Sequence, residues 1–159
     1  MKFTTPLPLK REHDELRAEL AITAKLPGPV GSIARDVATM LTAHLQKEEM
    51  FALPPLGLLS RLAMGDVTAG MAAVTTMTDH LKGELPTLLA EHARIIAALR
   101  RLAAAARDTN DFASARFAEQ FVAHIQTEEL VFYPAAILLG DCVRRHLRQA
   151  IKPALQLDG

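Results

Sequence analysis

The sequence has few of the residues from which several common kinds of site are built. Among 159 residues there is one cysteine, Cys142, one tyrosine and no tryptophan. A single cysteine excludes an internal disulfide, and it excludes a zinc or iron–sulfur site held by several thiolates of one chain. Any metal site must therefore use nitrogen and oxygen ligands.

A surplus of positive charge and a long apolar run are also absent. Eighteen basic residues balance eighteen acidic residues, whereas a domain that binds duplex nucleic acid usually carries an excess of positive charge. The longest apolar run, residues 131–139, contains a proline and is too short to span a bilayer. The first residues, MKFTTPLPLKREHDEL, hold no apolar run typical of a signal peptide. We therefore expect a cytoplasmic protein that binds neither nucleic acid nor a membrane.

What the sequence does contain favours packed helices. Half of its residues are hydrophobic and only 4% are aromatic, and apolar residues recur at helical spacing in four long segments. The length suits one domain over residues 1–159. We predict an all-α fold, an antiparallel up-down four-helix bundle built from two helical hairpins. The expected helices cover about 9–26, 30–51 and 86–107 and the apolar stripe 113–131, with a short helix in the 56–84 connection and a short C-terminal helix over about 141–151.

One stretch of the sequence occurs twice. Residues 44–56 read HLQKEEMFALPPL and residues 124–136 read HIQTEELVFYPAA. His44 with Glu48, and His124 with Glu128, are i, i+4 pairs, so each pair projects from one face of a helix. His13 precedes the first copy and His92 precedes the second, and both directly follow a glutamate. These elements define repeat one, about residues 9–56, and repeat two, about residues 86–136.

The spacing predicts that these side chains meet in one layer. His13 and His44 lie fifteen and sixteen residues from Gly28 at the first corner, and His92 and His124 lie seventeen and fifteen from Thr109 at the second. At 1.5 Å per residue, all four histidines stand roughly 22–26 Å from their corners. The expected layer lies near the open ends of both hairpins, beside the 56–84 connection.

The chemistry of the predicted layer points to metal ions. Glu48 and Glu128 fall on apolar stripes, where an unpaired carboxylate is strongly disfavoured and requires a cation or a tight polar network. Four imidazoles and two carboxylates suffice for two divalent ions if the carboxylates bridge. We expect His13 and His44 to hold one ion and His92 and His124 the other. Such a donor set with vacant positions favours iron, with manganese as second choice, over a closed zinc site.

The repeated pattern of a histidine followed by His-x-x-x-Glu-Glu-x-x-x-x-Pro resembles the hemerythrin-like HHE cation-binding family, over about residues 9–136. The resemblance implies a four-helix bundle with an oxo- or hydroxo-bridged non-haem di-iron centre that binds oxygen, nitric oxide or peroxide. Its ligand positions match His13, His44, Glu48, His92, His124 and Glu128.

The oxygen carriers of that family have a further histidine where this chain has Ile96. The set of four histidines and two glutamates is more similar to proteins that repair iron–sulfur clusters after nitrosative damage. Those proteins usually carry an additional cysteine-bearing N-terminal domain, whereas this chain starts almost directly at its first helix.

Three functions follow as hypotheses. The first is a di-iron protein that binds or senses oxygen, nitric oxide or peroxide in a stress response. The second is a repair protein that donates iron or reduces nitric oxide and works with a redox partner protein. The third is a metal-free helical interaction module with a hydrogen-bonded His-Glu layer. Whether the protein is an enzyme, and its oligomeric state, stay open.

Five further residues flank the predicted layer. We interpret His80 and Glu84 as a hydrated surface pair, and Tyr133 as a packed ring whose hydroxyl reaches water. Glu49 and Glu129, which follow the predicted ligands Glu48 and Glu128, are interpreted as groups around the site or on the surface.

Overall fold

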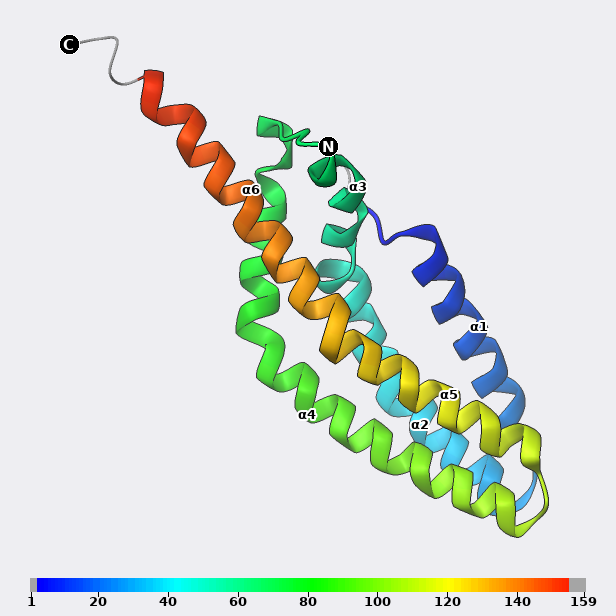
Figure 1. The fold of residues 1–159 in the computed structure, drawn as a ribbon. Coiled ribbons are helices and arrows are strands. Elements are labelled where there is room, and N and C mark those ends of the chain that lie inside the picture. The colour runs from blue at the N-terminus through cyan, green and yellow to red at the C-terminus, as the bar shows by residue number, and fades with distance from the viewer. Residues whose placement is uncertain (1–2, 155–159) are drawn as a thin grey trace.

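Four long helices form an antiparallel bundle in the computed structural model, which describes residues 3–154 and is helical throughout its regular elements (Figure 1). Helices α1 (Leu7–Thr23) and α2 (Gly28–Lys47) make the first hairpin, and α4 (Ala73–Asp108) and α5 (Phe112–Thr127) make the second. The predicted all-α bundle of two hairpins is confirmed. No helix within residues 3–154 is both long and apolar enough to cross a membrane.

Both corners of the hairpins use residues suited to tight turns. Gly28 has a φ of 74°, a conformation that residues with a side chain rarely adopt. Pro29 then occupies the first turn of α2, where its missing N–H is not needed. At the second corner, Asn110 has a φ of 58° and Asp111 caps α5, because its Oδ1 accepts a hydrogen bond from the Ser114 N–H at 3.1 Å.

Two apolar clusters fill the interior and leave a polar layer between them. One cluster occupies the part of the bundle near the corners and includes Leu41, Ile95, Leu99, Phe117 and Phe121. The second lies toward the other end and includes Phe51, Leu53, Leu81, Leu88 and Leu139. The two hydrophobic clusters bury the predicted layer from both sides and keep bulk water away from it.

Helix α4 begins earlier than its sequence pattern suggests. We expected it to start near Pro86, but it starts at Ala73 and carries Pro86 inside. An interior proline costs a helix roughly 3 kcal/mol. Here the first part of α4 buries Val74 and Leu81 completely, and it packs along α6 (Tyr133–Ala154). This burial offsets the proline, and α4 changes direction along its length in Figure 1, as proline-containing helices do.

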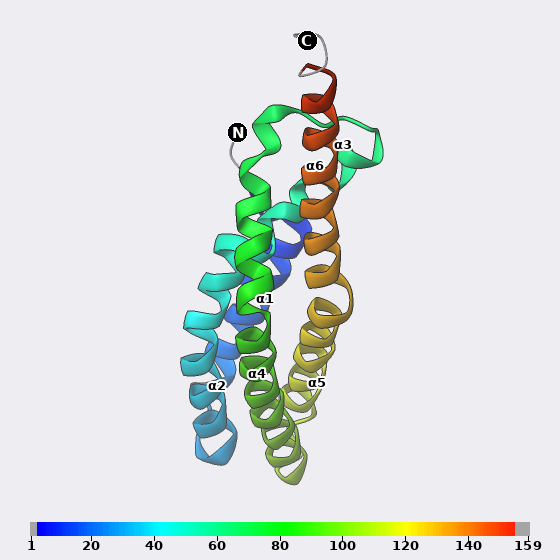
Figure 2. The ribbon, with the colours of Figure 1, turned by 90° about the vertical axis from the view of Figure 1, so that its left-hand side faces the viewer.

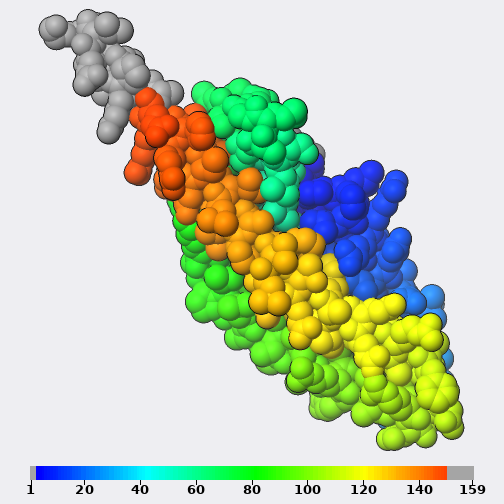
Figure 3. All heavy atoms as spheres, viewed as in Figure 1, coloured from blue at the N-terminus to red at the C-terminus, as the bar shows by residue number. Residues whose placement is uncertain are grey.

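The two copies of the repeated stretch share an unusual turn. A π-helical turn begins at Glu48 in the first copy (η1, Glu48–Ala52) and at Glu128 in the second (η4, Glu128–Phe132). After η4 the chain continues directly into α6, so α5, η4 and α6 form one rod that crosses the whole visible face of the molecule (Figures 1 and 3). The wide turn accommodates Pro134, since the Tyr133 N–H bonds five residues back to the Glu128 carbonyl.

The first copy leaves the bundle where the second copy continues. Pro54 is followed by a second proline, Pro55, whereas Pro134 is followed by Ala135. The chain after the first copy forms three short elements, η2 (Pro54–Leu58), α3 (Leu59–Ala63) and η3 (Ala69–Met71), before α4 starts. Helix α3 is a short helix within the 56–84 connection, but the one expected there was to bury Val67, Met71, Val74 and Leu81. These residues lie after α3, and Val74 and Leu81 belong to α4. The C-terminal helical segment expected over about 141–151 is present as the distal part of α6.

Close contact between α4 and α6 depends on Gly140. A Cβ at this position would overlap the Thr78 side chain, including its Cβ, which cannot rotate away. Figure 2 shows the two helices side by side. Alanine normally favours helix over glycine by up to about 1 kcal/mol, so packing and helix propensity oppose each other here.

We expect Gly140→Ala to lower the free energy of unfolding by about 1–3 kcal/mol, because overpacking outweighs the gain in helix propensity. Gly83→Ala in α4 is the matched control: a Cβ there meets nothing within 4 Å, so this variant gains up to about 1 kcal/mol. Urea unfolding of both variants measures the difference. Equal stabilisation by the two substitutions would show that α4 and α6 do not pack this closely.

Candidate metal centre

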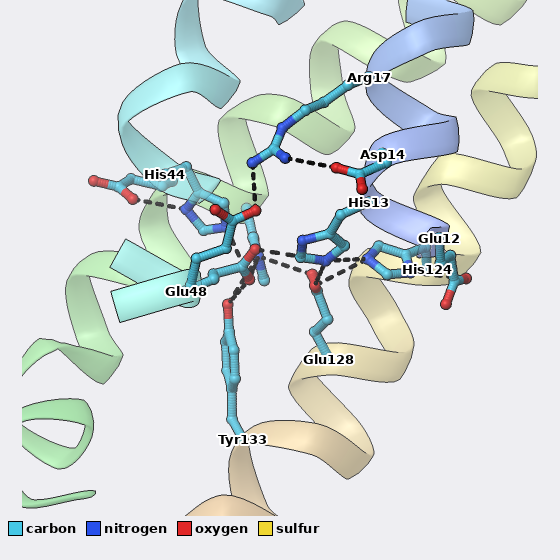
Figure 4. A network of polar contacts seen from close by, with 12 residues as sticks. Glu12, His13, Asp14, Arg17, His44, Glu48, His124, Glu128 and Tyr133 are labelled. Atoms are coloured by element: carbon cyan, nitrogen blue, oxygen red, sulfur yellow. Dashed lines mark hydrogen bonds and ion pairs between the residues drawn. The ribbon is translucent and has the colours of Figure 1, made fainter. Parts of the chain in front are cut away.

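The structure brings the six predicted ligands together in one buried layer (Figure 4). Each is at most 6% exposed, and they come from all four bundle helices or the π-helical turns that follow them. The predicted convergence at one level of the bundle therefore appears in the structure. The residues of this layer are His13, His44, Glu48, His92, His124 and Glu128.

The histidines form two groups. In the His13/His124 group the two Nε2 atoms lie 3.1 Å apart, and Glu128 Oε1 lies 3.1 Å from the first and 2.9 Å from the second. In the His44/His92 group the ring centroids lie 4.5 Å apart, and Glu48 Oε1 lies 3.3 Å and 3.8 Å from the two Nε2 atoms. Ligand atoms of His44, His92, Glu48 and Glu128 lie within 4.8 Å of one another, and so do those of His13, His124 and Glu128.

This grouping differs from the expected one. We expected each pair of histidines to come from one hairpin, with His13 beside His44 and His92 beside His124. The pairs instead cross between the hairpins, where α2 packs against α4 and α1 contacts α5, although the helices within each hairpin also pack against each other. The pseudo-twofold relation between the repeats is kept, since it exchanges α1 with α4 and α2 with α5.

The two carboxylates each face both groups. Glu128 points Oε1 at the His13/His124 group, and its Oε2 lies 3.5 Å from His92 Nε2. Glu48 points Oε1 at the His44/His92 group, and its Oε2 lies 4.0 Å from His13 Nε2. Two oxygens on opposite sides of each carboxylate are the arrangement that a bridge between two ions requires.

Two atoms in the centre of the layer test whether a cation fits there. His44 Nε2 and Glu48 Oε2 are buried and make no hydrogen bond within the described residues. Buried polar atoms are rarely left without a partner, because each unmet bond costs about 1–3 kcal/mol. A metal ion in the His44/His92 group would give His44 Nε2 a partner, and one in the His13/His124 group would give Glu48 Oε2 a partner, so the donor set fits cations.

Three outer carboxylates orient the imidazoles. Glu91 Oε2 lies 2.8 Å from His44 Nδ1, Glu129 Oε1 lies 3.0 Å from His92 Nδ1, and Glu12 Oε1 lies 3.0 Å from His124 Nδ1. An Nδ1–H that donates to a carboxylate leaves the Nε2 lone pair directed into the layer, which is the tautomer that a metal ligand needs.

The sequence did not reveal the partners of Glu12 and Glu91. Each directly precedes a histidine of the layer, but each contacts a histidine on a different helix. Periodicity places a side chain on a helix face and does not say which neighbouring helix it reaches. Glu129 contacts His92, so it is one of the groups around the site. Glu49 instead accepts a hydrogen bond at its Oε1 from Arg17 Nη2, at 2.6 Å.

Tyr133 belongs to the layer, and the expectation of a hydrated hydroxyl is wrong. Its side chain is buried, and the hydroxyl donates a short hydrogen bond to Glu48 Oε1 and lies 3.3 Å from His92 Nε2. The rod continues past Pro134, which turns the ring inward instead of toward solvent. Burial, together with the charge of Glu48, raises the pKa of Tyr133 strongly, so the phenol stays protonated.

His80 and Glu84 lie outside the buried layer, as the surface interpretation requires. His80 is exposed and its ring packs on Phe51, with centroids 4.3 Å apart. Glu84 Oε2 lies 3.8 Å from Lys47 Nζ. Lys47 also holds Glu91 at 2.6 Å, so Glu84 is linked to the site through a carboxylate outside the layer.

The electrostatics of the layer favour separated charges. Burial alone would raise the pKa of Glu48, but the neighbouring imidazoles of His44 and His92 and the Tyr133 hydroxyl outweigh it and lower the pKa. Burial alone would lower the pKa of His124, but the hydrogen bond and charge of Glu128 outweigh it and raise the pKa to about 9. Without metal, protons on imidazole thus compensate the carboxylates.

A four-helix bundle that buries two groups of imidazoles and carboxylates, each able to hold an ion, defines a cation-binding helical bundle. The chain matches the family model described as the Hemerythrin HHE cation binding domain over residues 8–136. It belongs to this family, and the resemblance drawn from the repeated motif is confirmed. Neither the curated proteins nor the solved structures give a significant match.

We expect the metal-free protein to become less stable as the pH rises from about 6.5 to 9. Folded His124 keeps its proton up to about pH 9, whereas an unfolded histidine loses it near 6.5. The folded state binds more protons in this window, so raising the pH favours unfolding, by about 1–3 kcal/mol across it. Urea unfolding at several pH values measures this, and a stability that rises across the window would contradict it.

Proposed function

We propose that this layer holds two iron ions bridged by Glu48 and Glu128, and that the resulting di-iron centre binds oxygen, nitric oxide or peroxide. The observation that carries the proposal is the placement of the four carboxylate oxygens, with one oxygen of each residue on each side of the layer. Each ion would take two imidazoles and two bridging oxygens. The His13/His124 group would hold one ion and the His44/His92 group the other.

The donor set supports iron as the metal. Imidazole and carboxylate ligands suit iron, and four protein ligands per ion leave positions open, unlike a closed structural zinc site. Manganese is the second choice on the same grounds. Bound iron supplies redox chemistry and open positions for a small ligand.

The chain's own residues shape how a small ligand would be held. The apolar clusters on both sides of the layer shield it from bulk water. Tyr133 keeps a protonated hydroxyl beside Glu48 and His92, where it can donate a hydrogen bond to a ligand in the layer. The outer carboxylates Glu12, Glu91 and Glu129 accept the Nδ1–H of their imidazoles, so that Nε2 would face a bound metal ion, and they increase the basicity of these imidazoles.

Repair of iron–sulfur clusters, by donation of iron or reduction of nitric oxide, is the second candidate. Ile96 favours this function. The oxygen carriers have a further histidine at this position, whereas Ile96 is an apolar side chain that packs on the hydrophobic core. A site with one imidazole fewer is more open. This function adds a redox partner protein and, like the first, is proposed for the cytoplasm.

Mixing the reduced, iron-loaded protein with oxygen separates the two functions. A stable adduct with a charge-transfer band supports reversible binding. Rapid oxidation without an adduct supports redox or repair work. Protein that takes up no iron would refute both and leave the helical interaction module.

We expect Glu48→Ala to lose both ions, because a bridging carboxylate serves both groups. Protein grown with iron should contain about two ions per chain, and the variant few or none. Glu119→Ala is the control, since Glu119 is exposed and pairs with Arg107 away from the layer. Metal analysis of the three proteins measures the count. A variant that keeps one full equivalent of iron would show that Glu48 does not bridge.

We expect Tyr133→Phe to keep both ions but to weaken retention of a bound small ligand about tenfold, because one hydrogen bond to a charged or polar group is lost. Stopped-flow measurement of ligand release from the iron-loaded protein gives the rate. An unchanged rate would show that the hydroxyl serves only Glu48.

A further inference from the structure

The pseudo-twofold relation predicts four outer carboxylates, one for each histidine. Glu12 in repeat one corresponds to Glu91 in repeat two, and both contact a histidine of the layer. Glu49 corresponds to Glu129. Glu129 contacts His92, so the repeat predicts a contact between Glu49 and His13. That fourth contact is missing.

Arg17 holds the fourth carboxylate elsewhere. Its Nη2 donates to Glu49 Oε1 at 2.6 Å, and its Nη1 donates to Asp14 Oδ1 at 3.3 Å, which keeps the guanidinium in place. Figure 4 shows Arg17 and Asp14 on α1 beside His13. The residue that corresponds to Arg17 in repeat two is Ile96, which packs on the apolar core and leaves Glu129 available to His92.

His13 is therefore the one histidine of the layer without an outer carboxylate. Its Nδ1 is buried and has no hydrogen-bond partner within residues 3–154, although the ring is only 1% exposed. Such outer partners fix the tautomer and orientation of a ligand, and their loss typically weakens metal binding 10–100-fold.

A cavity reaches this side of the layer. It has a volume of about 270 Å³. Its lining residues are Phe3, Thr4, Thr5, Lys10, His13 and Glu49. Glu49 and His13 thus border the same space, so a carboxylate released by Arg17 has room to turn toward Nδ1.

We propose that the His13/His124 group is the exchangeable one of the two metal positions, and that Arg17 makes it so by holding Glu49 away from His13. The inference rests on the proposed two-ion site. It assigns Arg17 as a positioning residue that sets unequal retention of two otherwise similar ions.

Release of iron to a chelator tests the inference. The reduced protein is loaded with ferrous iron without oxygen and mixed with an excess of a coloured ferrous chelator. The expected trace has two phases of equal amplitude, the faster one from the His13/His124 group. Glu12→Gln identifies this phase by accelerating it, and Glu91→Gln accelerates the slower phase, because each removes the carboxylate of one histidine.

Arg17→Leu should slow the fast phase about tenfold and leave the slow phase unchanged, because Glu49 then reaches His13. Arg17→Lys keeps the positive charge toward Glu49 and should retain the fast phase. Glu49→Gln should change little in the wild-type background but should restore fast release when added to Arg17→Leu. A merely structural ion pair would not produce this dependence on Glu49. If Arg17→Leu does not fold, Arg17→Gln takes its place, and the same slowing of the fast phase is expected.

Three results would overturn the inference: one phase for both ions in the wild-type protein, no slowing of the fast phase in Arg17→Leu or in the Arg17→Gln variant that replaces it, or an effect of Arg17→Leu on the slow phase. These results leave the two-ion site intact. A wild-type chain that binds fewer than two ions instead refutes the proposed function, and the inference with it.

Discussion

Two carboxylates buried inside an apolar bundle are the constraint on which the structure depends. Glu48 and Glu128 lie between two hydrophobic clusters, where a lone negative charge would cost several kcal/mol. Imidazoles from all four helices surround them, and three of those rings, all but His13, are oriented by further carboxylates nearer the surface. Helix lengths, corner positions and the level of each histidine all serve to bring these groups to one height.

The two π-helical turns connect this constraint to the shape of the bundle. Each begins at a buried glutamate, so the widened turn occurs where the side chain must reach the centre of the layer. In the second repeat the turn also lets the helix continue through Pro134, and the continued helix places the Tyr133 hydroxyl on Glu48. The corresponding residue of the first repeat is Leu53, so the two halves share a backbone device but differ in the chemistry around the layer.

The sequence predicts the fold class and the level of the layer, because helical periodicity and distance from a corner determine both. His13, His44, His92 and His124 meet for that reason. The pairing of the histidines across hairpins was not predictable, since each helix has a neighbour in its own hairpin and one in the other, and periodicity does not say which of them a side chain faces. The same reason explains the missed contacts of the outer carboxylates. The start of α4 was missed because tertiary burial of its first turns outweighs the local penalty of Pro86.

The central claim is that two bridging carboxylates hold two ions side by side in this layer. Anomalous diffraction at the iron edge from crystals of iron-loaded protein tests it directly. The account predicts two peaks about 3.5–4 Å apart, one beside His13 and His124 and the other beside His44 and His92. A single peak, or peaks away from Glu48 and Glu128, would contradict it.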